Sequence, residues 1–378
     1  MKKILQIAIL LLTIVLWTVS VAANDRESEI ESRIILDGTD IGAAAGDLLP
    51  VRDIVMRAGG TAEWVGHTRQ IVVRRGSRTV KMTIGSTRAG VNGSPVTLAA
   101  PPVMVGGRAM IDLCFFAEHL GLGVGHMNDA FILSTTPAQR IPVLTYHHIL
   151  PDAVNVHFRG NPWTISTENF AAQMRYLRDN GFYVPTLCEF EAFLYRGRPL
   201  PANSVMIHFD DGYYSNYVYA YPILRRYGLR AVIFPVTGHA ETLGEHQPPI
   251  CHDSLTHAAA ITLRSRTDIF ETASHTHDMH SIAYGTNLTR LMVSTHEEIV
   301  QDTLRSFEFV SNHRAFAYPR GLANDTVIEA LQEAGITMAF TVNRGYVTGR
   351  SNPLRLNRFT VYGDTTMARF RAIVNGRA

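Results

Sequence analysis

The pattern of hydrophobic and polar positions changes about a third of the way along the chain. Between residues 34 and 136, short alternating runs are separated by Asn92-Gly93 and Gly106-Gly107, which are typical of hairpin turns. From Ile141 onwards, apolar runs alternate with longer segments of helical periodicity. This order predicts a small β-rich α+β domain over residues 34–136, followed by an α/β domain over residues 141–378.

The first domain repeats its own pattern. Residues 50–71 can be laid over residues 112–133 with a constant offset, so that Val51 meets Leu113 and Gly59 meets Gly121. Each copy predicts a short amphipathic helix that ends at glycine and is followed by a strand.

The second domain is predicted to hold a parallel sheet. Strands are expected at residues 205–209, 231–236, 316–318 and 338–342, with helices from Thr167 and at residues 216–227, 297–310 and 326–334. Because strands and helices alternate over about 230 residues, the predicted fold of this domain is a distorted (β/α) barrel.

Composition narrows the function without naming it. A chain of 378 residues with 46% hydrophobic residues suits two packed domains. The formal net charge is +2 and no basic run stands out, so nucleic acid is not an expected partner. The three cysteines are Cys114, Cys188 and Cys251. They are widely spaced and form no CxxC pattern, which argues against a thiolate zinc site, and their odd number in an exported chain argues against a disulfide framework.

The N-terminus has the features of a targeting segment. Lys2 and Lys3 precede an apolar run, residues 4–21, which ends at the small residues Ala22 and Ala23. We interpret residues 1–23 as a signal peptide or an N-terminal membrane anchor, and the polar residues 24–33 as a linker. Both interpretations predict that the protein is exported and is extracellular or associated with the cell wall. It would be attached to the membrane only through this segment, and only if the segment is not cleaved.

Two adjacent carboxylates follow the apolar strand at residues 205–209. Asp210 and Asp211 precede Gly212, and catalytic sites of α/β barrels are built at this end of the strands. One carboxylate could bind a metal while the other remains free as a base. The alternative is an Asx-type turn with both carboxylates in solvent.

A histidine-rich segment offers the remaining metal ligands. His275 and His280 are five residues apart, which is wrong for one helix face, so a loop is expected there. Together with an aspartate they form a suitable ligand set for a divalent metal. His277 is expected to face away, and the alternative for the whole segment is a solvent-exposed loop.

Three motifs of the second domain resemble, in the expected order, those of polysaccharide deacetylases of carbohydrate esterase family 4, the NodB-homology group. His208–Gly212 is similar to the first motif, and Ser274–His280 to the second as found in poly-N-acetylglucosamine deacetylases. Ala317–Gly321 is similar to the third motif of that branch, and the resemblance covers about two thirds of the chain.

The resemblance implies roles for individual residues. It assigns a divalent metal, most simply Zn²⁺, to Asp211, His275 and His280, and the role of general base to Asp210. It also implies that the backbone N–H of Arg320 stabilises the oxyanion that forms when water attacks the acetamide carbonyl. The residues expected to contact substrate are Tyr213, Tyr318, Pro319 and Trp163, with core packing equally open for Trp163.

The chain departs from the family pattern at two places. Ala317 replaces the usual arginine of the third motif, and the late Leu-x-x-x-His element is absent, because His313 is the last histidine. His147 is therefore our candidate for the residue that donates a proton to the leaving amine. The equal alternative is that His147 is a buried histidine of the core, held by hydrogen bonds. Arg358 could support the site from a late strand, but a surface arginine is the favoured interpretation.

The first domain resembles the copper amine oxidase N-terminal-like domain of bacterial surface proteins. The similar segments are Leu49–Arg52, Trp64–Gly66, Ile84–Gly85, Val91–Gly93 and Pro101–Val103. Despite the family's name, no copper site is expected, and the resemblance implies adhesion or spacing at the cell wall.

The leading hypothesis is a metal-dependent hydrolase that removes N-acetyl groups from an N-acetylglucosamine-containing polysaccharide, either a cell-wall glycan or poly-N-acetylglucosamine. Its partners would be that polysaccharide and the cell wall or extracellular matrix. Two alternatives remain open: an O-acetyl esterase on wall glycan or xylan, and a catalytically inactive surface protein that binds glycan.

Overall fold

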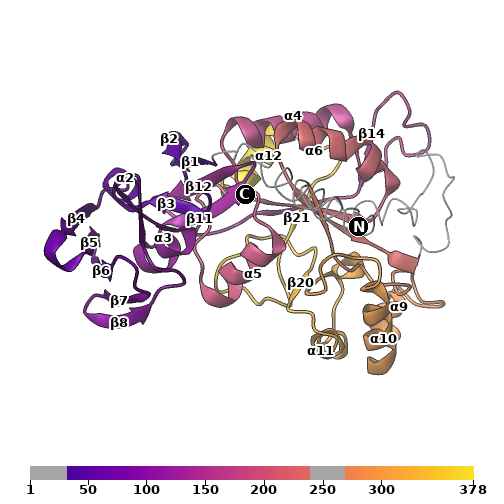
Figure 1. Cartoon of the computed structure of the whole chain (residues 1–378). Coiled ribbons are helices and arrows are strands. Elements are labelled where there is room, and N and C mark those ends of the chain that lie inside the picture. Colours follow the sequence, from indigo (N-terminus) through magenta and orange to yellow (C-terminus); the bar gives the residue numbers. More distant parts are fainter. Residues whose placement is uncertain (1–31, 239–268) are drawn as a thin grey trace, which may run out of the picture.

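The computed structural model describes residues 32–238 and 269–378, which form the two domains in Figure 1. The predicted targeting segment, most of the linker and Cys251 lie outside the described residues. In the described part of the chain, no helix combines the length and the apolar character that crossing a membrane requires.

The N-terminal domain is built from three small sheets, two α-helices and one short 3₁₀ helix, Gly66–Thr68. The first sheet has the order β11-β12-β1-β2, formed by Gly123–Met127, Ala130–Ser134, Arg33–Leu36 and Thr39–Ala43. The second has the order β3-β10-β9, formed by Leu48–Pro50, Arg108–Asp112 and Val103–Val105. The third is an antiparallel meander of β4 to β8: Thr61–Val65, Gln70–Arg75, Arg78–Thr83, Arg88–Val91 and Ser94–Thr97.

The predicted repeat is present in this domain. Helix α2 (Val51–Arg57) precedes strand β4, and helix α3 (Leu113–Leu120) precedes strand β11. Both helices are followed by a glycine with positive φ, 76° at Gly59 and 65° at Gly121, a conformation that a side chain disfavours. The apolar faces of both helices meet in one core.

The C-terminal domain is an α/β domain, as predicted. Its central sheet is parallel with the order β18-β17-β16-β13-β21. These strands are Phe270–Thr272, Ala231–Pro235, Met206–Asp211, Val143–Tyr146 and Phe359–Thr360. Two further parallel strands, β19 (Ala315–Ala317) and β20 (Met338–Phe340), pair with each other.

Single bridges extend this row of strands at both ends. Ser274, just after β18, pairs with Phe316 of β19, and Leu356, just before β21, pairs with Phe340 of β20. The segment between Leu356 and Thr360 therefore bonds first to β20 and then to β13. The two ends of the row meet at this segment, and the carboxyl ends of the strands face one region.

Helices cover the strands on both sides (Figure 1). Helices α4, α6 and α12 lie on one side and α5, α10 and α11 on the other. Their bounds are Thr167–Asp179, Tyr221–Tyr227, Met367–Val374, Leu187–Arg196, His296–Ser306 and Asp325–Glu333. Capping boxes begin α5 at Thr186 and α10 at Thr295, so these starts are encoded locally. The predicted helix at residues 216–227 begins instead with a π-helical turn, Asn216–Ala220.

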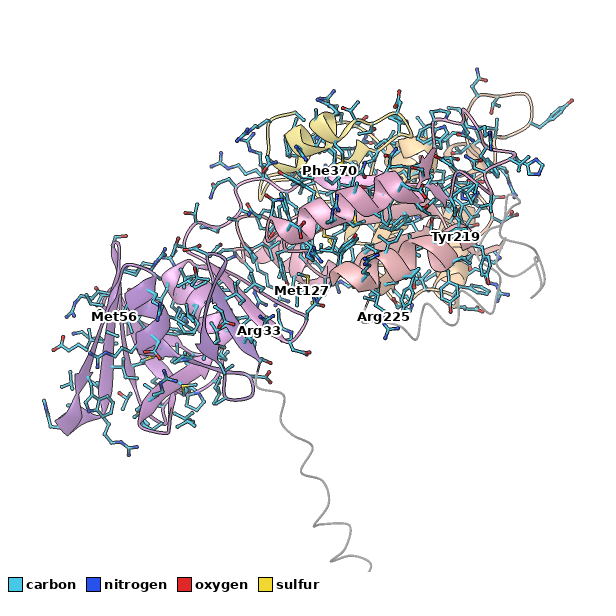
Figure 2. The ribbon with its side chains drawn as sticks, turned by 90° about the horizontal axis from the view of Figure 1, so that it is seen from above. Arg33, Met56, Met127, Tyr219, Arg225 and Phe370 are labelled. Carbon is cyan, nitrogen blue, oxygen red and sulfur yellow. The ribbon has the colours of Figure 1, made fainter. Side chains whose placement is uncertain are left out.

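The two domains are joined along strands β11 and β12. The N–H of Val124 donates to the carbonyl of Pro199 (3.0 Å), and the N–H of Ala202 donates to the hydroxyl of Ser134 (3.0 Å). Met127, which lies between the domains in Figure 2, packs against the core of the C-terminal domain. Hydrogen bonds and apolar contacts therefore fix one domain against the other.

Candidate metal and catalytic site

The two adjacent aspartates end strand β16 rather than lying in the turn after it. Asp211 has φ = 69°, and Gly212 follows with φ = 72°. Side chains alternate along a regular strand, but a left-handed residue breaks this alternation. Both carboxylates can therefore serve one cavity. Asp210 is only 3% exposed, so the alternative of a turn with solvated carboxylates is wrong.

Asp211, His275 and His280 converge on one point. Oδ1 of Asp211 lies 3.4 Å from Nε2 of His275 and 3.2 Å from Nε2 of His280. One ligand atom from each of the three residues lies within 4.8 Å of the others. Nδ1 of His275 lies 2.7 Å from the carbonyl oxygen of Ala317, to which it donates, so in the neutral imidazole Nε2 carries the lone pair and can bind a metal. These donors fit a divalent metal ion with open positions.

Charge and burial compete at this cluster. Burial alone would raise the pKa of Asp211, but hydrogen bonds from His275 and His280 outweigh it and hold that pKa well below its ordinary value. Burial is the largest single influence on His275 and would lower its pKa, but the hydrogen bond to Asp211 and the charges of Asp210 and Asp211 together outweigh it and raise that pKa. Asp211 is therefore ionised and ready to ligate, and a metal ion would displace the proton that His275 shares with it.

Asp210 forms a buried ion pair with Arg358. Nη1 and Nη2 of Arg358 donate to the two carboxylate oxygens, each at 2.7 Å, and Nε donates to the carbonyl of Thr341, also at 2.7 Å. Arg358 has 0% exposure, so its interpretation as a surface arginine is wrong. Burial favours the neutral acid, but Arg358 outweighs it and lowers the pKa of Asp210.

The loop that carries the histidines is held by Asp302 of helix α10. Its carboxylate accepts the backbone N–H groups of His277 (2.8 Å) and Asp278 (2.7 Å), between the two histidine ligands. Burial is the main cause of its raised pKa. Thr276 in the same loop has φ = 76°. Sequence reasoning missed Asp302, because an aspartate in a polar helix carries no signal of its own.

His277 turns away from the cluster, as predicted. Its Nδ1 lies 2.9 Å from the hydroxyl of Thr237, and its ring stacks on Phe309 with centroids 5.8 Å apart. It therefore belongs to the wall behind the loop.

The cluster opens into a cavity of about 380 Å³, within the size range of small-ligand sites. Asp210 and the three candidate ligands line it, together with four other predicted residues: His147, Trp163, Tyr213 and Arg320. Trp163 is 41% exposed, so it is a wall residue rather than a core residue. The ring of Tyr213 stacks on His148 with centroids 4.6 Å apart. Burial raises the pKa of Tyr213, and its hydroxyl remains protonated.

His147 reaches the cavity from the end of strand β13. Its ring centroid lies 4.6 Å from that of Trp163, and its buried Nδ1 has no hydrogen-bond partner among the described residues. Burial is the main cause of its lowered pKa, so its imidazole is neutral at pH 7.

The third motif reaches the site at Arg320, which lines the cavity. Arg320 has φ = 57°, in the short turn Pro319–Gly321 that follows β19. Two predictions for this motif are wrong, because neither Tyr318 nor Pro319 lines the cavity. The Tyr318 ring packs in the core beneath helices α10 and α11, and its hydroxyl donates to the carbonyl of Leu354 at 2.9 Å. Pro319 is buried.

Comparison with known families identifies two matches in this chain. Residues 44–131 match the copper amine oxidase N-terminal domain, and residues 197–339 match the polysaccharide deacetylase family.

Similar proteins and structures agree with these matches. The poly-beta-1,6-N-acetyl-D-glucosamine N-deacetylase of Staphylococcus aureus (strain MRSA252) is 28% identical over 207 residues, which are 53% of this chain and 69% of the relative. That of Staphylococcus epidermidis is 29% identical with the same coverage. The Streptococcus pyogenes deacetylase PplD, solved with acetate, is 23% identical, with a TM-score of 0.53 over 63% of this chain and 99% of that one. IcaB from Ammonifex degensii is 24% identical, with a TM-score of 0.51 over 64% and 99%. The likeness to these two structures concerns the fold alone.

Proposed function

We propose that this chain, whose residues 44–131 and 197–339 match the copper amine oxidase N-terminal domain and the polysaccharide deacetylase family, hydrolyses N-acetyl groups on a polysaccharide containing N-acetylglucosamine. The observation that carries the proposal is the meeting of Asp211, His275 and His280 with the Asp210–Arg358 pair in one cavity. The names of the staphylococcal relatives favour a β-1,6-linked polymer as substrate.

Asp211, His275 and His280 would hold the metal, and two imidazoles with one carboxylate suit Zn²⁺. When bound, such an ion supplies Lewis acidity, which polarises an amide carbonyl and acidifies water. The hydrogen bond from His275 to the Ala317 carbonyl fixes the ring so that Nε2 faces Asp211. This chain therefore contributes an oriented ligand set before substrate arrives.

Asp210 would act as the general base. Arg358 keeps its carboxylate ionised and orients it, so it can accept a proton from water as the oxygen attacks the acetamide carbonyl. Each carboxylate oxygen keeps a second lone pair beside the one facing Arg358. Arg320 lies at the same cavity, where its backbone N–H would stabilise the oxyanion that forms.

His147 is the candidate for returning the proton. When the C–N bond breaks, acetate leaves, and the sugar nitrogen needs one proton to become an amine. Because the pKa of His147 is lowered, its ring is neutral at rest and must first receive the proton that Asp210 takes from water. Both side chains line the same cavity, which supports such a transfer.

We further propose that the protein is exported and works at the cell wall or in the extracellular matrix. The support is the sequence of residues 1–23, with two lysines before an apolar run and small residues after it. Deacetylation there would place positively charged amines on a neutral polymer.

The test is acetate release from β-1,6-linked N-acetylglucosamine oligomers by the full chain. The protein would be freed of metal by chelation and assayed with and without added Zn²⁺, beside Asp210→Asn. Metal-dependent release that the variant loses would support the proposal. Release from O-acetylated glycan only would replace it with the esterase alternative, and binding without any release would support the inactive glycan-binding alternative.

A further inference from the structure

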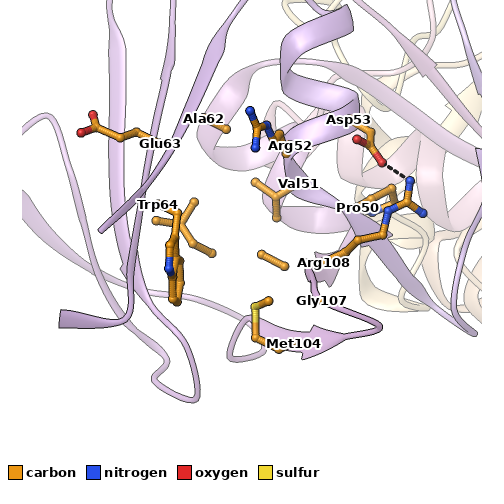
Figure 3. A pocket seen from close by; sticks show the side chains of 12 residues that line it. Pro50, Val51, Arg52, Asp53, Ala62, Glu63, Trp64, Met104, Gly107 and Arg108 are labelled. Atoms are coloured by element: carbon orange, nitrogen blue, oxygen red, sulfur yellow. Dashed lines mark hydrogen bonds and ion pairs between the residues drawn. The ribbon is translucent and has the colours of Figure 1, made fainter. Parts of the chain in front are cut away.

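A second hollow lies in the N-terminal domain, far from the metal ligands in sequence (Figure 3). Its volume is about 370 Å³, and it opens between β4, an edge strand of the meander, and β9, an edge strand of the β3-β10-β9 sheet. Buried Val51 and Ile71 lie at its base. The hollow is therefore a property of the fold, formed where two sheet edges meet helix α2.

Two large apolar side chains wall the hollow but remain accessible. Trp64 of β4 is 51% exposed and Met104 of β9 is 44% exposed. Trp64 pairs across β4 and β5 with Ile71, so its backbone is fixed by the sheet. An indole on a fixed backbone offers a flat apolar surface, and because it turns about only two side-chain torsions it loses little entropy on binding.

The formal charges of the residues that line the hollow sum to zero. Asp53 and Arg108 form an ion pair on the side opposite Trp64 (Figure 3), and Arg52 and Glu63 contribute one charge of each sign, with Glu63 also paired at 3.3 Å with Arg74, which does not line the hollow. Two guanidinium groups and two carboxylates give no net attraction for an anion or a cation. They do provide both donors and acceptors for a neutral ligand that carries many hydroxyl groups.

We propose that this hollow binds the N-acetylated polysaccharide itself, one sugar unit at a time. A pyranose ring has an apolar C–H face that can pack on Trp64, and an equatorial edge of hydroxyl and amide groups that can reach the charged residues opposite. A neutral amphipathic unit of this kind matches the hollow in both shape and charge. The inference rests on the proposed function, because that function identifies the polymer.

Binding at this hollow would have a direct effect on the enzyme. The two domains are fixed against each other through β11 and β12, so a polymer held by the first domain stays near the second. Linking two sites on one chain raises the affinity for a long ligand by a factor of about 10²–10⁴ when both can be occupied together. The domain would thus favour long polymers over short oligomers.

The experiment counts binding sites on the full chain by isothermal titration calorimetry with N-acetylglucosamine oligomers. The Asp210→Asn background prevents turnover. We expect two sites per chain, and one site after Trp64→Ala or after Met104→Ala, with at least a tenfold loss of affinity at the lost site. Met56→Ala is the matched control, because Met56 is 50% exposed in the same domain but does not line the hollow. Thermal unfolding checks that each variant is folded.

The outcomes separate this inference from the proposed function. One site per chain, unchanged by Trp64→Ala, would overturn the inference even if acetate is released. Loss of self-association on Trp64→Ala, measured by analytical ultracentrifugation, with oligomer binding unchanged, would also overturn it in favour of a second copy. Sugar binding that depends on Trp64, in a protein that releases no acetate, would support the binding site in the hollow and contradict the proposed deacetylase function.

Discussion

Replacing Arg358 should destabilise the protein in a pH-dependent way. Arg358→Met removes both partners of the Asp210 carboxylate while Asp210 remains buried. Breaking a buried pair from one side costs about 3–5 kcal/mol at neutral pH. For a domain of this size, about 2–4 °C of melting temperature accompanies each kcal/mol, so the expected fall is about 6–20 °C.

The sign of the pH dependence follows from the pKa of Asp210. In the parent protein Arg358 lowers this pKa, so the pair contributes stability above the unfolded pKa of about 3.9, and loses it as pH falls through the folded value. In the variant, burial remains the largest influence on the pKa of Asp210 and raises it, because only the weaker effects of His275 and His147 still oppose it. The variant is then most stable at low pH and loses stability as pH rises through about 4 towards the folded value. The difference between the two proteins should therefore widen from pH 4 to pH 7.

The assay is differential scanning calorimetry of the metal-free protein at pH 4, 5, 6 and 7. Arg344→Met is the matched control, because Arg344 is an exposed arginine over the ring of Phe359 and should contribute about 1 kcal/mol or less at every pH. Adding Asp210→Asn to Arg358→Met should recover part of the loss, since no buried charge remains. A melting difference that is equal at pH 4 and pH 7 would refute the reasoning.

Three further predictions concern the site. Asp302→Ala should weaken Zn²⁺ binding about 10–100-fold in a chelator competition, because it frees the loop between the two proposed histidine ligands. The control Asp325→Ala removes an exposed aspartate and should leave the affinity unchanged, and equal affinities of the two variants would show that Asp302 does not position this loop. Removing metal with a chelator should abolish acetate release, and activity that survives chelation would contradict the metal site. Zn²⁺ at about 100 times its Kd should raise the free energy of unfolding by about 2.7 kcal/mol, which thermal melts would detect. Gly321→Ala should lower kcat, because Gly321 has φ = 71° and an added Cβ would lie 2.4 Å from Val342 Cγ2. Gly349→Ala is the control, because open space surrounds Gly349, and equal kcat values for the two variants would show that this turn does not position Arg320.

Local patterns in the sequence predicted much of the fold. The repeated helix and strand of the first domain follow from apolar spacing and from glycines at positive φ, which are properties of neighbouring residues. The convergence of Asp211, His275 and His280 was predictable because parallel strands end at the same edge, and because the motifs resemble a known family.

Contacts between distant residues were not predictable in this way. Arg358 reaches Asp210 across 148 positions, and a single arginine in a late strand has no pattern that separates it from a surface arginine. Asp302 is recognisable only once α10 is packed against the loop. Tyr318 was misplaced because its sequence position beside the cavity does not reveal which way its ring points.

The hydrogen bond from His275 to the Ala317 carbonyl has a consequence for how this enzyme can change over time. The acceptor belongs to the main chain, so any residue type at position 317 supplies it. What matters is the strand pairing that brings Ser274 beside Phe316 and sets the carbonyl's direction. Mutational drift at position 317 should leave the imidazole's orientation intact, whereas an insertion or deletion before it would shift the register and misorient this proposed metal ligand without changing any residue of the proposed site. Length is thus under stricter control than identity in this part of the chain.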